Sequence, residues 1–169
     1  NANQLQDDLA IIAGDLGYVS DDHGGSAENA TALLVEPDGN ILVSNPELDP
    51  ENLLPENKGI IDDRNDVDWF YIDIDGTGTV SLAATPAWHA FPRGEKRGAN
   101  LDIELSVFDS GLELVDFSEP DDNTNAAVNF SVSTGRYFIQ VDGVGNNTNS
   151  DYSDYASLGM YFLEGFVDA

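Results

Sequence analysis

The sequence predicts an all-β protein: an antiparallel β-sandwich of jelly-roll type with about eight or nine strands, preceded by a short N-terminal helix. After residue 17, short runs of alternating polar and apolar side chains are separated by Asn, Asp, Gly and Pro, a pattern typical of half-buried strands and their turns. Several runs are joined by tight turns, as expected for antiparallel neighbours. At 169 residues, the chain has the size of one domain with its own core.

The helical pattern is confined to residues 4–16, QLQDDLAIIAGDL. Apolar side chains recur there at spacings of four, three and four residues, which places them on one helix face. They are Leu5, Leu9, Ile12 and Leu16. Asp7 and Asp8 fall in the first turn, where the helix dipole favours negative charge, and Gly17 is a natural stop.

Residues 1–17 are therefore assigned to a helical lead-in, and residues 18–169 to the sandwich. The expected strands are Ala30–Val35, Gly39–Val43, Val67–Asp73, Thr79–Ala84, Leu101–Asp109, Glu113–Ser118, Ala126–Val132, Gly135–Val141 and Gly159–Phe166. In the segment DWFYIDID, one face carries Trp69, Tyr71 and Asp73, and the other carries Phe70, Ile72 and Ile74. Residues 44–58 contain three prolines and are expected to form a loop.

The charge is strongly acidic, with 32 Asp and Glu against 6 Lys and Arg, a net charge of −26. Such a chain is expected to repel nucleic acid and anionic membranes, since both are bound through clustered Lys and Arg. It is expected to attract divalent cations. The absence of cysteine excludes disulfides and Cys-based zinc sites. Because the chain starts at Asn1 and its one methionine is Met160, we expect a processed piece of a longer protein.

Catalytic signatures are lacking in the sequence, and we expect no enzyme activity from this chain. Its two histidines, His23 and His89, lie in segments bordered by Gly or Pro and outside any H-E-x-x-H helix. A G-x-S-x-G nucleophile elbow is absent. With 32 acidic residues, chance carboxylate pairs are inevitable, and nothing distinguishes one pair as a glycosidase site.

An acidic segment, IIDDRNDVDWF, precedes the aromatic strand and supplies oxygen ligands close together: Asp62, Asp63, Asn65, Asp66 and Asp68. Neighbouring carboxylates repel one another unless water or a cation neutralises them. Calcium prefers six to eight oxygen ligands. The segment is no EF-hand, since Gly and Glu are missing at the required positions. A calcium site and a solvated acidic turn both stay open.

Five segments occur in an order that resembles the bacterial pre-peptidase C-terminal (PPC) domain. They are YVSDDHGGSAENATAL, RNDVDWFYIDI, ANLDIELSVFDSGLELV, TGRYFIQVDGVG and SDYASLGMYFLEG. The resemblance runs from about Tyr18 to Val167 and implies a β-sandwich module appended to secreted peptidases and other hydrolases. The lead-in resembles the segment that joins the catalytic domain of reprolysin-like zinc metallopeptidases to such a module, which implies a metallopeptidase parent.

In related collagen-binding modules, calcium lies between an N-terminal Glu-Pro-Asn-Asp motif and an acidic turn before a strand. Carried over by position, the metal ligands implied by this resemblance are Asp21, Asp22, Asn65, Asp66 and Asp68. This sequence departs from the motif because Val19 stands in place of the leading Glu, which removes one ligand. His23 is then interpreted as a turn residue rather than a ligand.

A basic and aromatic segment, residues 85–100, stands out from the acidic background. Its candidate ligand contacts are Trp88, Phe91, Arg93, Lys96 and Arg97. Aromatic faces beside cations suit sugar rings with sulfate or carboxylate groups, or an acidic surface of the parent catalytic domain. The same side chains could instead pack at the core edge. Tyr155 is a further candidate contact, although its place in a family motif favours packing.

Taken together, the sequence predicts a non-catalytic, Ca²⁺-stabilised accessory module of a secreted bacterial hydrolase. We expect it to be extracellular and monomeric, with two partners: the parent catalytic domain and an extracellular polymer, either polysaccharide or a collagen-like protein. Two alternatives stay open. One is a maturation or secretion segment cleaved from its parent, and the other is a dedicated carbohydrate-binding module of a polysaccharide-degrading enzyme.

Overall fold

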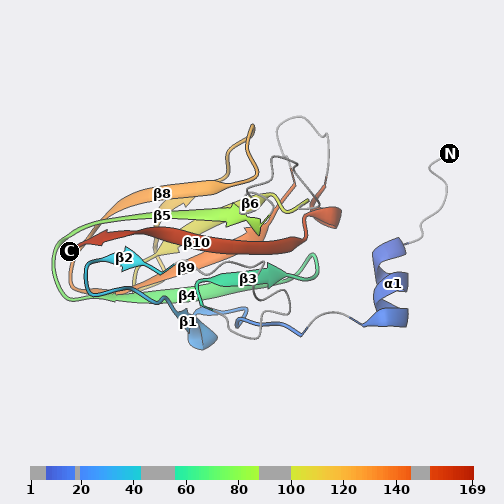
Figure 1. Ribbon diagram of the computed structural model, residues 1–169, viewed down its shortest axis with the longest axis horizontal. Helices are drawn as coiled ribbons and strands as arrows, with labels where there is room; N and C mark the ends of the chain where they lie inside the picture. The colour runs from blue at the N-terminus through green and yellow to red at the C-terminus, as the bar shows by residue number, and fades with distance from the viewer. Residues whose placement is uncertain (1–6, 18–19, 43–55, 88–99, 146–152) are drawn as a thin grey trace.

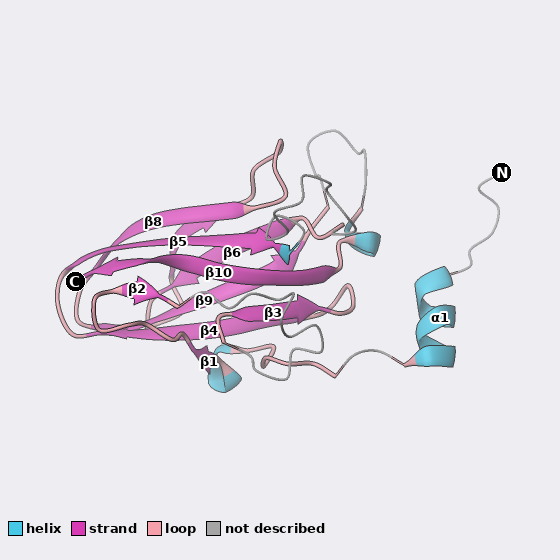
Figure 2. Cartoon of the chain, viewed as in Figure 1, coloured by secondary structure: helices cyan, strands magenta, loops and turns pink. Residues whose placement is uncertain are grey.

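The computed structural model describes residues 7–17, 20–42, 56–87, 100–145 and 153–169. Two β-sheets face each other, and one short α-helix stands beside one end of them (Figure 1). Strands dominate the described chain, with only short helical segments (Figure 2). The predicted all-β sandwich with a short N-terminal helix is confirmed.

The first sheet, sheet A, has five strands in the order β1-β4-β9-β6-β7. Their bounds are β1 Thr31–Ala32, β4 Val67–Ile74, β9 Gly135–Gly143, β6 Ile103–Phe108 and β7 Leu114–Ser118. All neighbours in this sheet are antiparallel except β1, which runs parallel to β4.

The second sheet, sheet B, has the order β2-β10-β5-β8, and β3 also pairs with β10. Their bounds are β2 Asn40–Ile41, β3 Lys58–Ile61, β5 Gly78–Pro86, β8 Ala126–Val132 and β10 Gly159–Asp168. All described pairs in sheet B are antiparallel. Figure 1 shows β8, β5 and β10 side by side, with β2 and β3 along the other edge of β10.

The core lies between the sheets and is made by alternation along the strands. In β4, the buried positions are every second residue, as expected for a strand with one face on the core. The largest fully buried side chains include Phe70, Tyr161, Leu105 and Ile139. The alternation predicted for this strand from its sequence agrees with the structure.

Strand β3 was not predicted. Residue 58 was assigned to the end of the proline-containing loop, and Ile60 and Ile61 to the acidic segment. The run Lys58–Ile61 is too short to show alternation, and it becomes a strand by pairing with β10. The strands expected at Ala30–Val35 and Gly39–Val43 were too long, since β1 and β2 have two residues each.

Helix α1 spans Asp8–Leu16, and the side chain of Asp7 caps it by accepting a hydrogen bond from the Ala10 N–H. Gly17 ends the helix with a φ of 81°, a conformation that favours glycine. None of the helix residues is buried, so the expected apolar face does not enter the core. The 3₁₀ turns η1 Ala27–Asn29 and η3 Asp154–Ala156 complete the described elements. No helix in the described residues is long and apolar enough to span a membrane.

Candidate metal centre

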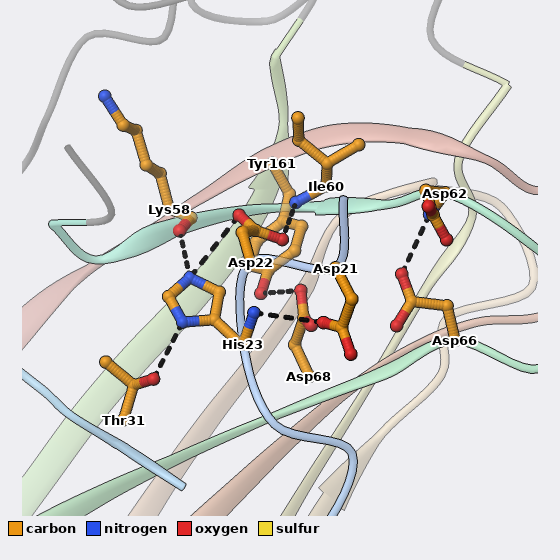
Figure 3. Close-up of polar contacts among 10 residues, drawn as sticks. All are labelled: Asp21, Asp22, His23, Thr31, Lys58, Ile60, Asp62, Asp66, Asp68 and Tyr161. Atoms are coloured by element: carbon orange, nitrogen blue, oxygen red, sulfur yellow. Dashed lines mark hydrogen bonds and ion pairs between the residues drawn. The ribbon is translucent and has the colours of Figure 1, made fainter. Parts of the chain in front are cut away.

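Three carboxylates converge where the segment before η1 passes beside the start of β4. Asp21 and Asp22 come from this segment, and Asp68 comes from β4. One carboxylate oxygen of each lies within 4.8 Å of the others. Figure 3 shows these three side chains grouped together, with Asp62 and Asp66 to one side. The structure therefore brings together carboxylates that are 47 residues apart in the chain (Asp21 to Asp68).

Asp68 is fully buried, with none of its surface exposed. Its Oδ2 accepts a hydrogen bond of 2.6 Å from the Tyr161 hydroxyl. Its Oδ1 is buried and has no hydrogen-bond partner in the described part of the chain. Burial, more than the nearby carboxylates of Asp22 and Asp66, raises the pKa of Asp68 to about 9.

Asp22 supplies the second carboxylate and is half-buried, with 8% of its side chain exposed. Its Oδ1 accepts a hydrogen bond of 3.3 Å from the Ile60 N–H of β3. Its Oδ2 is buried without a hydrogen-bond partner among the described residues. Burial raises the pKa of Asp22 to about 7. Two carboxylate oxygens thus lie in the interior without the partners that buried polar atoms normally have.

Asp21 lies at the exposed rim of this cluster. Its Oδ1 accepts a hydrogen bond of 3.2 Å from the His23 N–H. This bond closes a short turn of the backbone at residues 21–23, which directs the side chains of Asp21 and Asp22 to the same place.

His23 is buried rather than exposed in a turn, so its interpretation as a turn residue was incomplete. Its Nε2 donates to the Lys58 carbonyl at 2.6 Å, and its Nδ1 then accepts from the Thr31 hydroxyl at 2.9 Å. The ring packs 4.4 Å from the Phe70 ring. Burial lowers the pKa of His23, so the ring is neutral and its 3.6 Å approach to Asp22 Oδ2 is no ion pair. His23 holds the segment in place through both nitrogens.

Of the remaining two expected metal ligands, Asp66 is engaged within its own turn, and Asn65 is exposed. Asp66 Oδ2 accepts a hydrogen bond of 2.8 Å from the Asp62 N–H, and burial raises the pKa of Asp66 to about 6. Asn65 is exposed, and its backbone N–H donates to Asp63 Oδ1 at 2.6 Å. Asp66 is close enough to raise the pKa of Asp22 and Asp68, but it lies outside the group of three.

Two residues that support the centre were not singled out from the sequence. Tyr161 lies in one of the PPC-like segments, but the sequence assigned it no role, and Gly59 was not considered. An added Cβ at Gly59 would lie 2.6 Å from Asp68 Oδ2, so only glycine leaves room for the Asp68–Tyr161 pair. A signal for the buried position of Asp68 did exist, because it shares the core-facing register with Phe70 and Ile72.

Of the candidate ligand contacts, one lies within the described residues and five lie outside them. Trp88, Phe91, Arg93, Lys96 and Arg97 lie outside the described residues. Tyr155 is described, and its hydroxyl donates to Asp7 Oδ1 and accepts from the Leu9 N–H, both at 2.8 Å. The Arg64 guanidinium lies 5.0 Å from the centre of its ring. Tyr155 thus connects α1 to the sandwich.

The donor set suits a hard cation. Carboxylate oxygens are the ligands that calcium prefers, and the two oxygens without partners are acceptors that a cation would satisfy. His23 cannot add a nitrogen ligand, because both of its nitrogens are hydrogen-bonded. The centre therefore fits Ca²⁺ better than zinc, which favours nitrogen and sulfur.

Comparison with solved structures finds a similar fold in a known domain. The chain superposes on the pre-peptidase C-terminal domain of a collagenase from Bacillus anthracis with a TM-score of 0.50, covering 84% of this chain and 99% of that one. The chain has a PPC-like fold. The sequence identity is 10%, so the likeness concerns the fold. No family model matches the sequence, and no curated protein matches it.

Proposed function

We propose that this PPC-like domain is a non-catalytic accessory module of a secreted bacterial hydrolase, stabilised by Ca²⁺ at Asp21, Asp22 and Asp68. The observation that carries the metal assignment is a pair of buried carboxylate oxygens, Asp22 Oδ2 and Asp68 Oδ1, which have no hydrogen-bond partner in the described ranges. Leaving such groups unsatisfied costs about 1–3 kcal/mol each, and more when they are charged. A bound cation removes this cost.

The accessory role is supported by the likeness to a domain of a collagenase, a protein that carries such a domain beside other parts. On this proposal the module is extracellular and attached to a parent catalytic domain. It holds a polymeric substrate near the enzyme and binds neither nucleic acid nor membranes. Its net charge of −26 supports the exclusion of nucleic acid and anionic membranes.

The calcium centre connects three parts of the sandwich. Asp22 accepts a hydrogen bond from the Ile60 N–H of β3, and Asp68 belongs to β4. The Tyr161 hydroxyl of β10 donates a hydrogen bond to Asp68. Sheets A and B meet here, since β4 belongs to the first and β3 and β10 to the second. A cation at this position would hold the N-terminal segment against both sheets.

Thermal unfolding in Ca²⁺ and in excess chelator tests the proposal. A ligand that binds only the folded state, present at about 100 times its Kd, stabilises by about 2.7 kcal/mol. For a domain of this size, that corresponds to a rise in Tm of about 5–11 °C. Mg²⁺ at the same concentration should give a smaller rise, because it demands a stricter geometry. Identical melting curves in Ca²⁺ and chelator would contradict the metal assignment.

A further inference from the structure

The outer face of sheet B carries a groove of about 660 Å³ that crosses β2, β10, β5 and β8. The strand register sets four outward side chains in one row across these strands. They are Asn40, Phe166, Ser81 and Asn129, paired in that order. A shallow groove of this size is within the range of small-molecule sites.

The neighbouring row explains why the face is hollowed. Glu164 pairs with Ala83, and Ala83 pairs with Ala127. Two alanines in register, next to Ser81 in the first row, leave little side-chain volume above β5 and β8. Phe166 and Glu164 of β10 are larger side chains that also line the groove.

Phe166 is an exposed aromatic side chain held in a fixed place. It is 41% exposed, and its ring lies against the turn at Gly39, where an added Cβ would be 3.1 Å from a ring carbon. Gly39 has a φ of 90°, which favours glycine, and its carbonyl accepts the Val167 N–H at 2.8 Å. The ring is therefore supported from one side and open on another.

Among the described residues that line the groove, the polar ones are the neutral Asn40, Ser81 and Asn129 and the carboxylate Glu164. The Asn40 side chain is oriented by donating to Asp38 Oδ2 at 2.8 Å, and Asn129 is fixed by its backbone N–H to Asp116 Oδ2 at 3.0 Å. None of the described residues that line the groove is Lys or Arg. With a net charge of −26, this face disfavours anionic ligands.

We infer that this groove binds the pyranose rings of an uncharged polysaccharide. A pyranose presents C–H groups on its faces and hydroxyls around its edge. The faces stack on an aromatic ring such as Phe166, while the hydroxyls hydrogen-bond to amide and carboxylate groups such as Asn129 and Glu164. The inference rests on the proposed function in taking a polymer as ligand, but it is independent of the calcium centre.

Pull-down on insoluble cellulose, chitin, β-1,3-glucan and starch tests this site with the whole chain. Wild type is expected to bind at least one of these polymers, and Phe166→Ala to lower the affinity about tenfold or more, as loss of a central aromatic contact does. Asn129→Ala should give a smaller loss. Phe117→Ala is the matched control, since Phe117 is 46% exposed on β7 of the other sheet, and it should bind like wild type.

Several outcomes overturn the inference: no binding of wild type to any of the four polymers, unchanged binding by both groove variants, or an equal loss in Phe117→Ala. Melting curves of the variants verify folding, and Asn129→Ala serves as the test if Phe166→Ala is unfolded. Binding to collagen fibrils without binding to polysaccharide overturns this inference and leaves the proposed function standing. A missing Ca²⁺ response contradicts the metal centre and leaves the groove unaffected.

Discussion

Strand β4 carries an aspartate near each end, and the two have opposite environments. Asp68 faces the core with none of its surface exposed, and burial raises its pKa to about 9. Asp73 lies on the outer face with 57% of its side chain exposed. It forms a bidentate pair with Arg136, and the Arg136 hydrogen bonds lower its pKa. The same residue type in one strand is thus destabilised as an anion at one end and stabilised at the other.

The difference between Asp68 and Asp73 shows which acidic side chains lack a partner that would stabilise their charge. Asp73 has its own cation within the protein, and Arg136 also lies 3.9 Å from the centre of the Tyr71 ring. Among the described residues, the hydrogen-bond donor to Asp68 is the neutral hydroxyl of Tyr161, so Asp68 needs a proton or an external cation. Acidic residues therefore indicate metal binding only where burial prevents water from solvating their carboxylates.

Of the substitutions in β4, Asp68→Asn should have the largest effect on the stabilisation by Ca²⁺. The amide oxygen can still accept from Tyr161, but a negative ligand is lost. We expect the rise in Tm with Ca²⁺, about 5–11 °C in wild type at 100 times the Kd, to be nearly abolished. In chelator the Tm should equal or exceed that of wild type, because no charge needs neutralising. A full Ca²⁺ response in this variant would show that the cation binds elsewhere.

The pH dependence in chelator should have opposite signs for the two aspartates. The raised pKa of Asp68 means that the folded state binds a proton more tightly than the unfolded state. Its contribution is complete below pH about 3.8 and is lost as the pH rises toward about 9. Asp22 and Asp66, whose pKa values are also raised, act in the same direction.

The lowered pKa of Asp73 gives a contribution that is present above its unfolded pKa and is lost only in acid. Urea unfolding of wild type and Asp68→Asn between pH 5 and 8 measures the difference. Wild type should lose stability relative to the variant as the pH rises. If the free energy of unfolding changed with pH in the same way in both proteins, the raised pKa of the buried Asp68 would be contradicted.

Asp73→Asn should have the smallest effect. The pair with Arg136 is solvent-exposed, and exposed ion pairs contribute little to stability and are screened by salt. We expect a slight decrease in Tm that disappears at high salt, with an unchanged Ca²⁺ response. A decrease as large as that produced by chelation in wild type would mean that the outer face of β4 matters as much as its core face.

Much of the fold could be predicted from the sequence, because alternation and turn residues are local signals. Strand β4 and the hairpin of β6 and β7 are clear examples. A hairpin of β8 and β9 would be wrong, because the short connection between them leads from sheet B to sheet A. Strand β3 could not be predicted, since its pairing with β10 joins segments about 100 residues apart. The parallel pairing of β1 with β4 is likewise set by the path of the chain and not by local pattern.

The candidate site was predictable in its residue types and less so in its geometry. The family resemblance indicated Asp21, Asp22 and Asp68, which the structure brings together. It also indicated Asp66, whose carboxylate accepts a hydrogen bond within its own turn, and Asn65, which is exposed. Which oxygens lack partners depends on Tyr161, 93 residues away from Asp68, and on the space left by Gly59. Neither can be read from the acidic segment alone.

Strand β10 has a consequence for the order in which this protein folds during synthesis. It follows the other described strands in the chain, yet it lies inside sheet B and pairs with β2, β3 and β5. Sheet B therefore cannot be completed until residues 159–168 have left the ribosome, although β5 and β8 pair without them. Such long-range pairing also makes folding slow. Until β10 is available, β2 and β3 lack the strand with which they pair, and Asp68 lacks the hydrogen bond from Tyr161.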